Sequence, residues 1–244
     1  MSEDERYFDA ASKLIADMAK DEEGNIARAV DRLFETVRNR SLIHVFGSGH
    51  SHMGAEELFE RAGGIVGINP ILDPSLMPAS KISSTLERTH GFGKTLFGFY
   101  APNAGPGDTA IVISNSGRNP LPVEIAMEAG SRGMPVIALT SLAHARAFRS
   151  RHESGMLLTD IADIVIDTHV PAGDAAVRVK QDVMAGPLST LAVVCILNEM
   201  VVRICRKMAD AGLEPPILRS ANVDGSEEYN RAMVRAFEGR GRLI

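Results

Sequence analysis

The sequence lacks several features that would assign the chain to a specialised class of protein. No run of apolar residues reaches the length of a membrane-spanning helix. Lys and Arg number 26 against 31 Asp and Glu, and no basic cluster resembles a nucleic-acid footprint. There is also no low-complexity segment and no internal repeat beyond an alternation of strands and helices. We therefore expect neither a membrane nor a nucleic acid as a partner.

Neither the cysteines nor the first residues carry a recognisable signal. Cys195 and Cys205 are the two cysteines and share one apolar, helical segment, where their spacing suits neither a metal knuckle nor a disulfide. We expect buried thiols there. The opening MSEDERYFDA is acidic, whereas a secretion signal would be basic and then apolar. These features predict a cytoplasmic protein.

Five short apolar runs dominate the middle of the chain. Each has the length of a strand, does not alternate with polar residues and is rich in Val and Ile, as in parallel strands covered on both faces. Between the third and fourth runs, PLPVEIAMEAGSRGM has apolar residues at helical spacing, which completes a βαβ unit. The pattern predicts an α/β fold with a doubly wound parallel sheet of about five strands. The runs are residues 42–47, 65–72, 109–116, 135–141 and 163–170.

Helical segments flank this core, and we expect residues 1–244 to form a single domain. The long apolar helix expected at residues 183–211 indicates either burial on all sides or a subunit interface. Residues 73–104 mix helix and loop signals, so a flap and an ordinary excursion both remain open. The expected parts are N-terminal helices at 1–39, a βα core at 40–170, the long helix at 183–211 and a polar tail at 212–244.

The first expected strand runs into a glycine- and serine-rich loop within HVFGSGHSHMGAEELF, residues 44–59. A dinucleotide site needs a third glycine where His52 stands, which makes a nicotinamide-dependent oxidoreductase the weaker hypothesis. His50 and His52 lack a third ligand at a recognisable spacing, so we expect no metal. A phosphate suits the loop better, because glycines expose N–H groups and a helix start attracts anions. A simple turn capped by Ser51 is the alternative.

A second hydroxyl-rich loop follows the third expected strand, in ISNSGRNPLPVEIA, residues 113–126. The carboxyl ends of parallel strands meet at one edge of a sheet, where ligands bind. The two loops could therefore hold one phosphate together. The fourth expected strand also ends in hydroxyls, at Thr140 and Ser141.

At these loops the chain resembles the SIS (sugar isomerase) family of phosphosugar isomerases and phosphosugar-binding domains. The resemblance rests on GSGHS, SNSGRN and EIAMEAGSRGMPVIALTS, and covers about residues 40–170. The whole chain is most similar to a branch of stand-alone SIS proteins related to phosphoheptose isomerase. Asn119 stands where the family commonly has Ser or Thr. The phosphate-binding residues that the two loops and the resemblance imply are Ser48, Ser51, Ser114, Asn115, Ser116 and Asn119.

The resemblance also implies catalytic residues for aldose–ketose isomerisation, which needs a base to move a proton between adjacent carbons and an acid for the oxygens. Relatives of phosphoheptose isomerase carry an acid on the helix after the first loop, where Glu56, Glu57 and Glu60 stand. Counting from Gly47 leaves open which of the three corresponds, and we favour Glu57. Other members place a glutamate on a late helix, where Glu199 stands in an apolar segment. His52 or His90 would serve as the acid. For the glutamates, an exposed helix face is the alternative.

The leading hypothesis is a phosphosugar isomerase that works on a sugar phosphate without a metal or any cofactor. A non-catalytic phosphosugar sensor is the alternative, since SIS domains also have that role. An NAD-dependent oxidoreductase is a less favoured third hypothesis. Because SIS domains commonly pair and donate residues across the interface, the resemblance implies a homodimer or a higher homo-oligomer.

Overall fold

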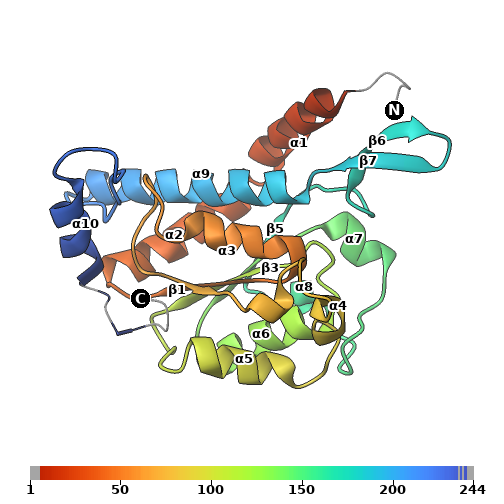
Figure 1. The fold of residues 1–244 in the computed structure, drawn as a ribbon, viewed down its shortest axis with the longest axis horizontal. Helices are drawn as coiled ribbons and strands as arrows, with labels where there is room; N and C mark the ends of the chain where they lie inside the picture. Colours follow the sequence, from red (N-terminus) through yellow and green to blue (C-terminus); the bar gives the residue numbers. More distant parts are fainter. Residues whose placement is uncertain (1–5, 236, 238, 241–244) are drawn as a thin grey trace.

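A five-stranded parallel sheet forms the centre of the protein, seen here in a computed structural model that describes residues 6–235, 237, 239 and 240 (Figure 1). The strand order is β2-β1-β3-β4-β5. The predicted α/β fold with a doubly wound parallel sheet is confirmed, and each apolar run contains one strand. The strands are β1 (Ile43–Gly47), β2 (Ile68–Ile71), β3 (Thr109–Ile113), β4 (Val136–Thr140) and β5 (Ile164–Asp167).

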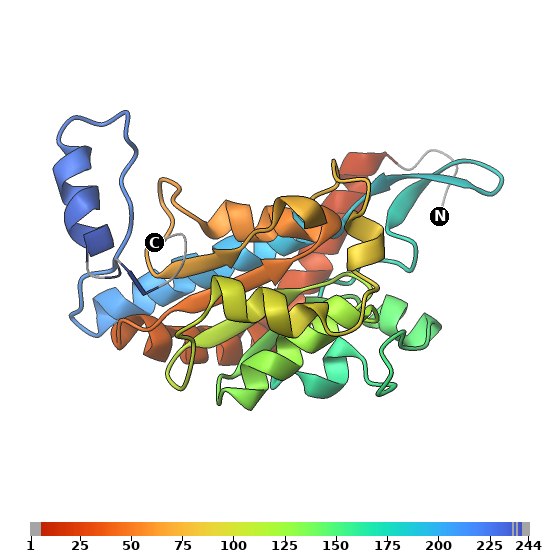
Figure 2. The same ribbon diagram turned by 60° about the horizontal axis from the view of Figure 1, so that its bottom comes forward.

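Helices cover both faces of the sheet, which explains why the strands are apolar without alternation (Figures 1 and 2). One face packs against α1 (Tyr7–Asp21), α2 (Glu23–Arg38), α3 (His52–Leu58) and α9 (Ser189–Asp210). The other face packs against α5 (Phe92–Tyr100), α6 (Pro120–Ser131) and α8 (Leu158–Ile161). In the part of the chain that the structure describes, no helix has the length and apolar character to cross a membrane.

The strand order reverses direction at β1, which has β2 on one side and β3 on the other. In sheets of this kind the ligand crevice opens outside the carboxyl ends of the strands at that reversal. Gly47 ends β1 and pairs with Ile113, the last residue of β3. The two loops that follow these residues therefore start side by side.

The segment before α9 differs from the sequence-based expectation. Instead of a helix from residue 183, β6 (Ala175–Lys180) and β7 (Val183–Pro187) form an antiparallel hairpin, and α9 begins at Ser189. Asp182 has a φ of 61°, which turns the chain between the two strands. Gly186, at a φ of 74°, and Pro187 are poor residues with which to continue a helix.

Most of the apolar side chains of α9 are buried against other elements of the same chain. Val193, Ile196 and Leu197 are among its buried residues, and α9 packs against α2 and α3. Val202 is an exception, with 43% of its surface exposed. Burial on several sides, the first of the two predicted explanations, thus accounts for most of the pattern.

The remaining segments connect and extend this core. Residues 73–104 form an ordered excursion in which α5 packs on α6. The polar tail carries α10, at the opposite end of α9 from the hairpin, and residues 241–244 lie outside the described part (Figure 1). The further short elements are η1 (Gly49–Ser51), η2 (Pro74–Leu76), α4 (Ser83–Leu86), α7 (Leu142–Ala147) and α10 (Ser226–Arg235).

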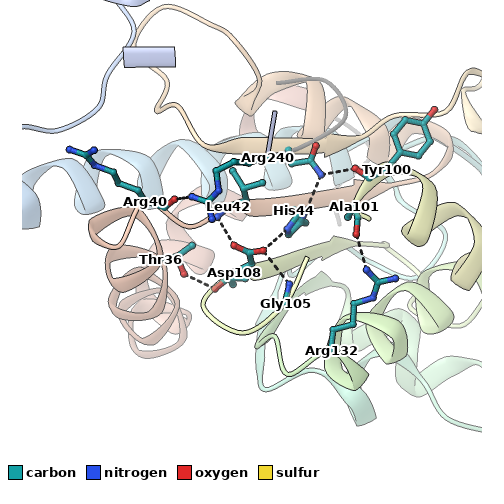
Figure 3. Close-up of polar contacts among 12 residues, drawn as sticks. Thr36, Arg40, Leu42, His44, Tyr100, Ala101, Gly105, Asp108, Arg132 and Arg240 are labelled. Carbon is teal, nitrogen blue, oxygen red and sulfur yellow. Dashed lines mark hydrogen bonds and ion pairs between the residues drawn. The ribbon is translucent and has the colours of Figure 1, made fainter. Parts of the chain in front are cut away.

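A buried polar network joins the three strands next to the reversal point (Figure 3). His44 is 2% exposed, and its Nε2 lies 3.2 Å from Asp108 Oδ2 while Asn69 Nδ2 lies 2.9 Å from its Nδ1. Burial raises the pKa of Asp108, but hydrogen bonds from His44 and from the N–H groups of Leu42 and Gly105 outweigh it and lower that pKa overall. The network ties β1 and β2 to the start of β3, and apart from Asn69 Oδ1, which has no partner, its polar side-chain atoms are bonded within the core.

Candidate functional site

The first loop leaves β1 through a turn that only glycine allows. A Cβ on Gly47 would lie 2.3 Å from the carbonyl oxygen of Ser51, so a side chain there would block the turn. Gly54 permits the next close contact, because a Cβ there would lie 2.6 Å from Ile113 Cδ1. The close approach of helix to strand, which a dinucleotide fingerprint assigns to a third glycine at position 52, is thus made possible by Gly54.

The second loop runs against the end of β4. Gly117 has a φ of 58°, and a Cβ on it would lie 2.9 Å from Thr140 Oγ1. Ser114 Oγ accepts a hydrogen bond of 3.2 Å from the N–H of Gly117, which holds the turn closed. The loop then enters α6 at Pro120, and the N–H of Leu121 donates to the carbonyl oxygen of Glu87.

A small cavity opens between these loops and the start of α9. Its lining combines hydroxyl, amide and imidazole groups with a few apolar side chains. Sequence reasoning missed the hydroxyls of Thr168, Ser189 and Thr190, since they follow β5 and begin a distant helix. The lining residues are His50, Ser51, Gly54, Asn115, Leu139, Thr168, Ser189, Thr190 and Val193.

Buried polar atoms without partners gather at this edge of the sheet. Among the described residues, six buried side-chain nitrogen or oxygen atoms have no hydrogen-bond partner, and one of them, Asn69 Oδ1, lies in the core network. Each such atom costs about 1–3 kcal/mol unless a ligand or water satisfies it. The other five, which lie on or just after β3, β4 and β5, are Asn115 Oδ1, Arg118 Nε, Thr140 Oγ1, His144 Nδ1 and Thr168 Oγ1.

The second loop also carries positive charge. Burial, together with the guanidinium groups of Arg151 and Arg88, lowers the pKa of Arg118. Arg151 Nη1 donates to Asn119 Oδ1 over 2.9 Å, and the Arg118 guanidinium lies 5.2 Å from the centre of the Phe148 ring. Three neighbouring guanidinium groups beside hydroxyl-rich loops favour an anion such as phosphate.

The structure brings the six predicted phosphate-binding residues to this edge but engages several of them with protein partners. Ser51 lines the cavity, and its side chain makes no capping hydrogen bond at the start of α3, which argues against a simple capped turn. Asn115 lines the same cavity. Ser48 Oγ donates to Glu87, Ser114 accepts from Gly117, Ser116 is half-buried between them in the loop, and Asn119 is bonded to Arg151.

The three predicted catalytic residues do not line the cavity. Glu57 forms an ion pair with Arg61 and accepts a 2.9 Å hydrogen bond from Asn198 on α9. His52 is buried, with Nδ1 against the carbonyl oxygen of Gly49 and Nε2 3.5 Å from Glu56. These contacts give both residues structural partners within or next to α3.

Glu199 lies elsewhere on the molecule. Its side chain is 53% exposed and 4.0 Å from Arg203, at a separate cavity of about 260 Å³ between α9 and the N-terminal helices. A carboxylate that was not predicted, that of Glu87, reaches the start of the first loop, where its Oε1 accepts a 2.8 Å hydrogen bond from Ser48 Oγ. Glu87 lies in the excursion at residues 73–104, where no sequence pattern separates it from the neighbouring charges.

One group of described residues could hold a metal ion, and it lies outside the first loop. His90, in the excursion, and His152 and Glu153, between α7 and α8, place ligand atoms within 4.8 Å of one another. His50 and His52, considered as ligands above, do not belong to this group.

Solved structures of two kinds share the fold. Phosphoheptose isomerase GmhA from Neisseria gonorrhoeae matches with a TM-score of 0.55 and 17% identity, covering 83% of this chain and 95% of that one. The Vibrio vulnificus NanR protein complexed with ManNAc-6P matches with a TM-score of 0.54 and 17% identity, covering 94% of this chain and 67% of that one. At this identity the likeness is one of fold.

Sequence relatives extend over nearly the whole chain. A UPF0309 protein of Thermoanaerobacter pseudethanolicus is 39% identical, covering 96% of this chain and 97% of its own length. A UPF0309 protein of Listeria innocua is 37% identical, covering 98% of this chain and 97% of its own length. The family model described as SIS domain matches residues 6–141. The chain therefore belongs to the SIS domain family, together with these UPF0309 proteins.

Proposed function

We propose that this protein binds a phosphorylated sugar in the crevice between the loops at residues 48–52 and 114–119. The observation that carries the proposal is the group of buried, unpartnered polar atoms at the ends of β3 to β5, next to three neighbouring arginines. A sugar phosphate supplies both an anion for the arginines and hydroxyls for the polar atoms. The names of the SIS-fold structures, a phosphoheptose isomerase and a protein complexed with ManNAc-6P, agree with this class of ligand.

The two ends of such a ligand would meet different parts of the site. The phosphate would lie between Ser51, Ser116 and Arg118, where hydroxyl and guanidinium donors converge on the loop edge. The sugar would extend towards Asn115 and Thr168, whose unpaired Oδ1 and Oγ1 can accept hydrogen bonds from its hydroxyls. An NAD-dependent reaction is less well supported, since none of the loop and cavity residues named here forms a dinucleotide-binding motif.

We further propose that the bound sugar is isomerised between its aldose and ketose forms. A base removes the proton from C2 of the open-chain aldose and returns it to C1, while a second group carries a proton between the two oxygens. Glu87 does not line the cavity either, but we assign it the first role because Ser48 holds its carboxylate at the first loop. His50 lines the cavity and can carry the second proton.

A phosphosugar sensor without catalytic activity is the second candidate. It is favoured by the positions of Glu57, His52 and Glu199, which leave the cavity without the acid and base expected from the family resemblance. The sensor and the enzyme share the same binding site and differ in the consequence of binding.

One set of experiments separates these functions. A thermal-shift screen of the whole chain against aldose phosphates, ketose phosphates, the free sugars and NAD(H) should find stabilisation by sugar phosphates alone, because a ligand that binds the native state raises its stability. Conversion of the best ligand is then followed by proton exchange from solvent into C1 or C2. Exchange supports the isomerase, whereas binding without exchange supports the sensor. Stabilisation by NAD(H) and not by sugar phosphates would contradict both.

We also propose that the protein is a homodimer or a higher homo-oligomer. Large apolar side chains remain exposed on α1 and on the hairpin, where Phe8 is 76% exposed and Val179 is 65% exposed. Tyr7 Oη donates to the carbonyl oxygen of Pro187 over 2.9 Å, which joins α1 to the hairpin. Exposed apolar area of this kind marks interaction surfaces. In such an assembly, Glu199 would be available to a neighbouring subunit.

A further inference from the structure

Three metal-ligating side chains converge beside the crevice from two separate segments. His90 belongs to the turn between α4 and α5, whereas His152 and Glu153 belong to the loop between α7 and α8. One ligand atom from each lies within 4.8 Å of the other two. The imidazole rings of His90 and His152 have centroids 5.6 Å apart.

Neighbouring groups hold the backbone next to His90 and the ring of His152 in place. The carboxylate of Glu124 accepts hydrogen bonds from the N–H groups of Gly91 (2.6 Å) and Gly93 (2.7 Å), which fixes the turn that carries His90. His152 Nδ1 lies 2.7 Å from Ser154 Oγ and accepts a 3.2 Å hydrogen bond from the N–H of Ser154, so Nε2 is the ring nitrogen that faces other groups. The same Nε2 lies 3.9 Å from Glu124 Oε1. The turn that carries His90 and the ring of His152 are thus held next to each other.

We propose that His90, His152 and Glu153 form a binding site for a divalent cation of the zinc class. Two imidazoles and one carboxylate are a donor set that Zn²⁺ accepts and that Mg²⁺ and Ca²⁺, which prefer oxygen alone, do not. Ligand atoms about 2 Å from one ion lie about 3.3–3.5 Å from one another. His90 and Glu153 are exposed, so rotation of their side chains can close the remaining distance.

A cation at this site would join the two segments that reach the phosphate-binding loops. Glu87, three residues before His90, contacts Ser48, and Arg151, next to His152, contacts Asn119. The ion would therefore hold the segments carrying Glu87 and Arg151 together at one side of the crevice. This role differs from that of a catalytic metal, because none of the three ligands lines the cavity.

The test uses the full chain after removal of bound metals with a chelator. Titration with Zn²⁺ alone, followed by calorimetry, should show one saturable site. His90→Gln and His152→Gln should each lower the affinity by more than the roughly 10–100-fold typical of losing a second-sphere partner. His50→Gln is the matched control, since it removes an exposed imidazole outside the trio, and it should keep the wild-type affinity. Glu153→Gln should weaken binding as well.

Hydrogen exchange gives a second readout that does not depend on activity. Zn²⁺ should slow exchange in residues 87–94 and 149–155 of the wild type and leave His90→Gln unaffected, with circular dichroism confirming that the variants are folded. The proposal is overturned if Zn²⁺ does not saturate one site, or if His90→Gln and His152→Gln bind as tightly as the wild type. It is also overturned if His50→Gln is the variant that loses binding, because the ion would then lie on the first loop.

Discussion

Ser48 and Glu87 are joined by a hydrogen bond of 2.8 Å from the serine hydroxyl to the glutamate Oε1. Ser48 is the first residue after β1, and Glu87 lies in the excursion between β2 and β3. The carbonyl oxygen of Glu87 also accepts from Leu121 in the first turn of α6. The excursion therefore contacts both the loop after β1 and the start of the helix that follows the second loop, and it places a carboxylate beside the hydroxyl of Ser48.

The first prediction concerns Glu87 as the base. Glu87→Gln keeps the size of the side chain and an oxygen that can accept from Ser48, but it cannot take up a proton from carbon. We expect turnover to fall by about 100-fold or more, the usual share of general base catalysis, with sugar-phosphate affinity retained. Steady-state kinetics and calorimetry measure the two quantities. Glu228→Gln, on α10, is the control and should change neither. An unchanged turnover in Glu87→Gln would remove Glu87 from the mechanism.

The second prediction concerns recognition of the phosphate. Arg118→Ala should lower the affinity for a sugar phosphate by about 10–150-fold, which is equivalent to losing a charged hydrogen bond worth about 1.5–3 kcal/mol. Affinity for the unphosphorylated sugar should stay the same. Arg206→Ala, an exposed arginine on α9, serves as the matched control. If Arg118→Ala lowers the affinities for the phosphorylated and the unphosphorylated sugar equally, the guanidinium does not contact the phosphate.

A third prediction separates the two serines of the second loop. Ser116→Ala should weaken the sugar phosphate and leave the melting temperature nearly unchanged. Ser114→Ala should weaken it too and also lower the free energy of unfolding by about 0.5–1.5 kcal/mol, because the N–H of Gly117 loses its acceptor. Denaturant titrations and binding isotherms provide the comparison. Equal affinity in wild type and Ser116→Ala would contradict the placement of the phosphate.

The fourth prediction is that the free energy of unfolding depends on the ionisation of Asp108 at acid pH. The pKa of Asp108 is lowered in the folded protein. The ionised carboxylate therefore contributes its full stabilisation above the ordinary pKa of 3.8, and this stabilisation is lost as the pH falls through the lower pKa of the folded state. Asp108→Asn should be less stable than the wild type at neutral pH by about 1–3 kcal/mol, because an amide cannot accept all the hydrogen bonds of the carboxylate. The difference should shrink as the pH drops below 3.8. A difference that does not change with pH would show that the charge of Asp108 is not responsible.

The last prediction concerns assembly. Light scattering at micromolar concentration should give at least twice the chain mass of 26.2 kDa. Phe8→Asp should reduce the mass of the assembly, since it places a charge on the most exposed large apolar side chain of α1. If subunits share a site, mixing Glu87→Gln with Glu199→Gln should recover part of the activity that each lacks alone. A monomer that binds and converts its ligand would exclude a shared site.

The sequence alone determined the framework of the protein. Strands covered on both faces are continuously apolar, so β1, β3, β4 and β5 could be located from runs of Val and Ile. Because parallel strands end at one edge, the loops after β1 and β3 could be paired before their contact was known. The motifs in these loops identified the family, which the comparisons confirmed. Local pattern and chain direction are sufficient for such conclusions.

The tertiary structure alone decided what each polar side chain contacts. Glu57 was the glutamate favoured as the base, yet its carboxylate accepts from Asn198, which is 141 positions away in the chain. Glu87 carried no signal but reaches Ser48. His90 and His152 meet although 62 positions separate them, so no spacing rule for metal ligands could find them. The partner of a charged group depends on which distant elements pack together, and hydrophobic burial over the whole chain determines that packing.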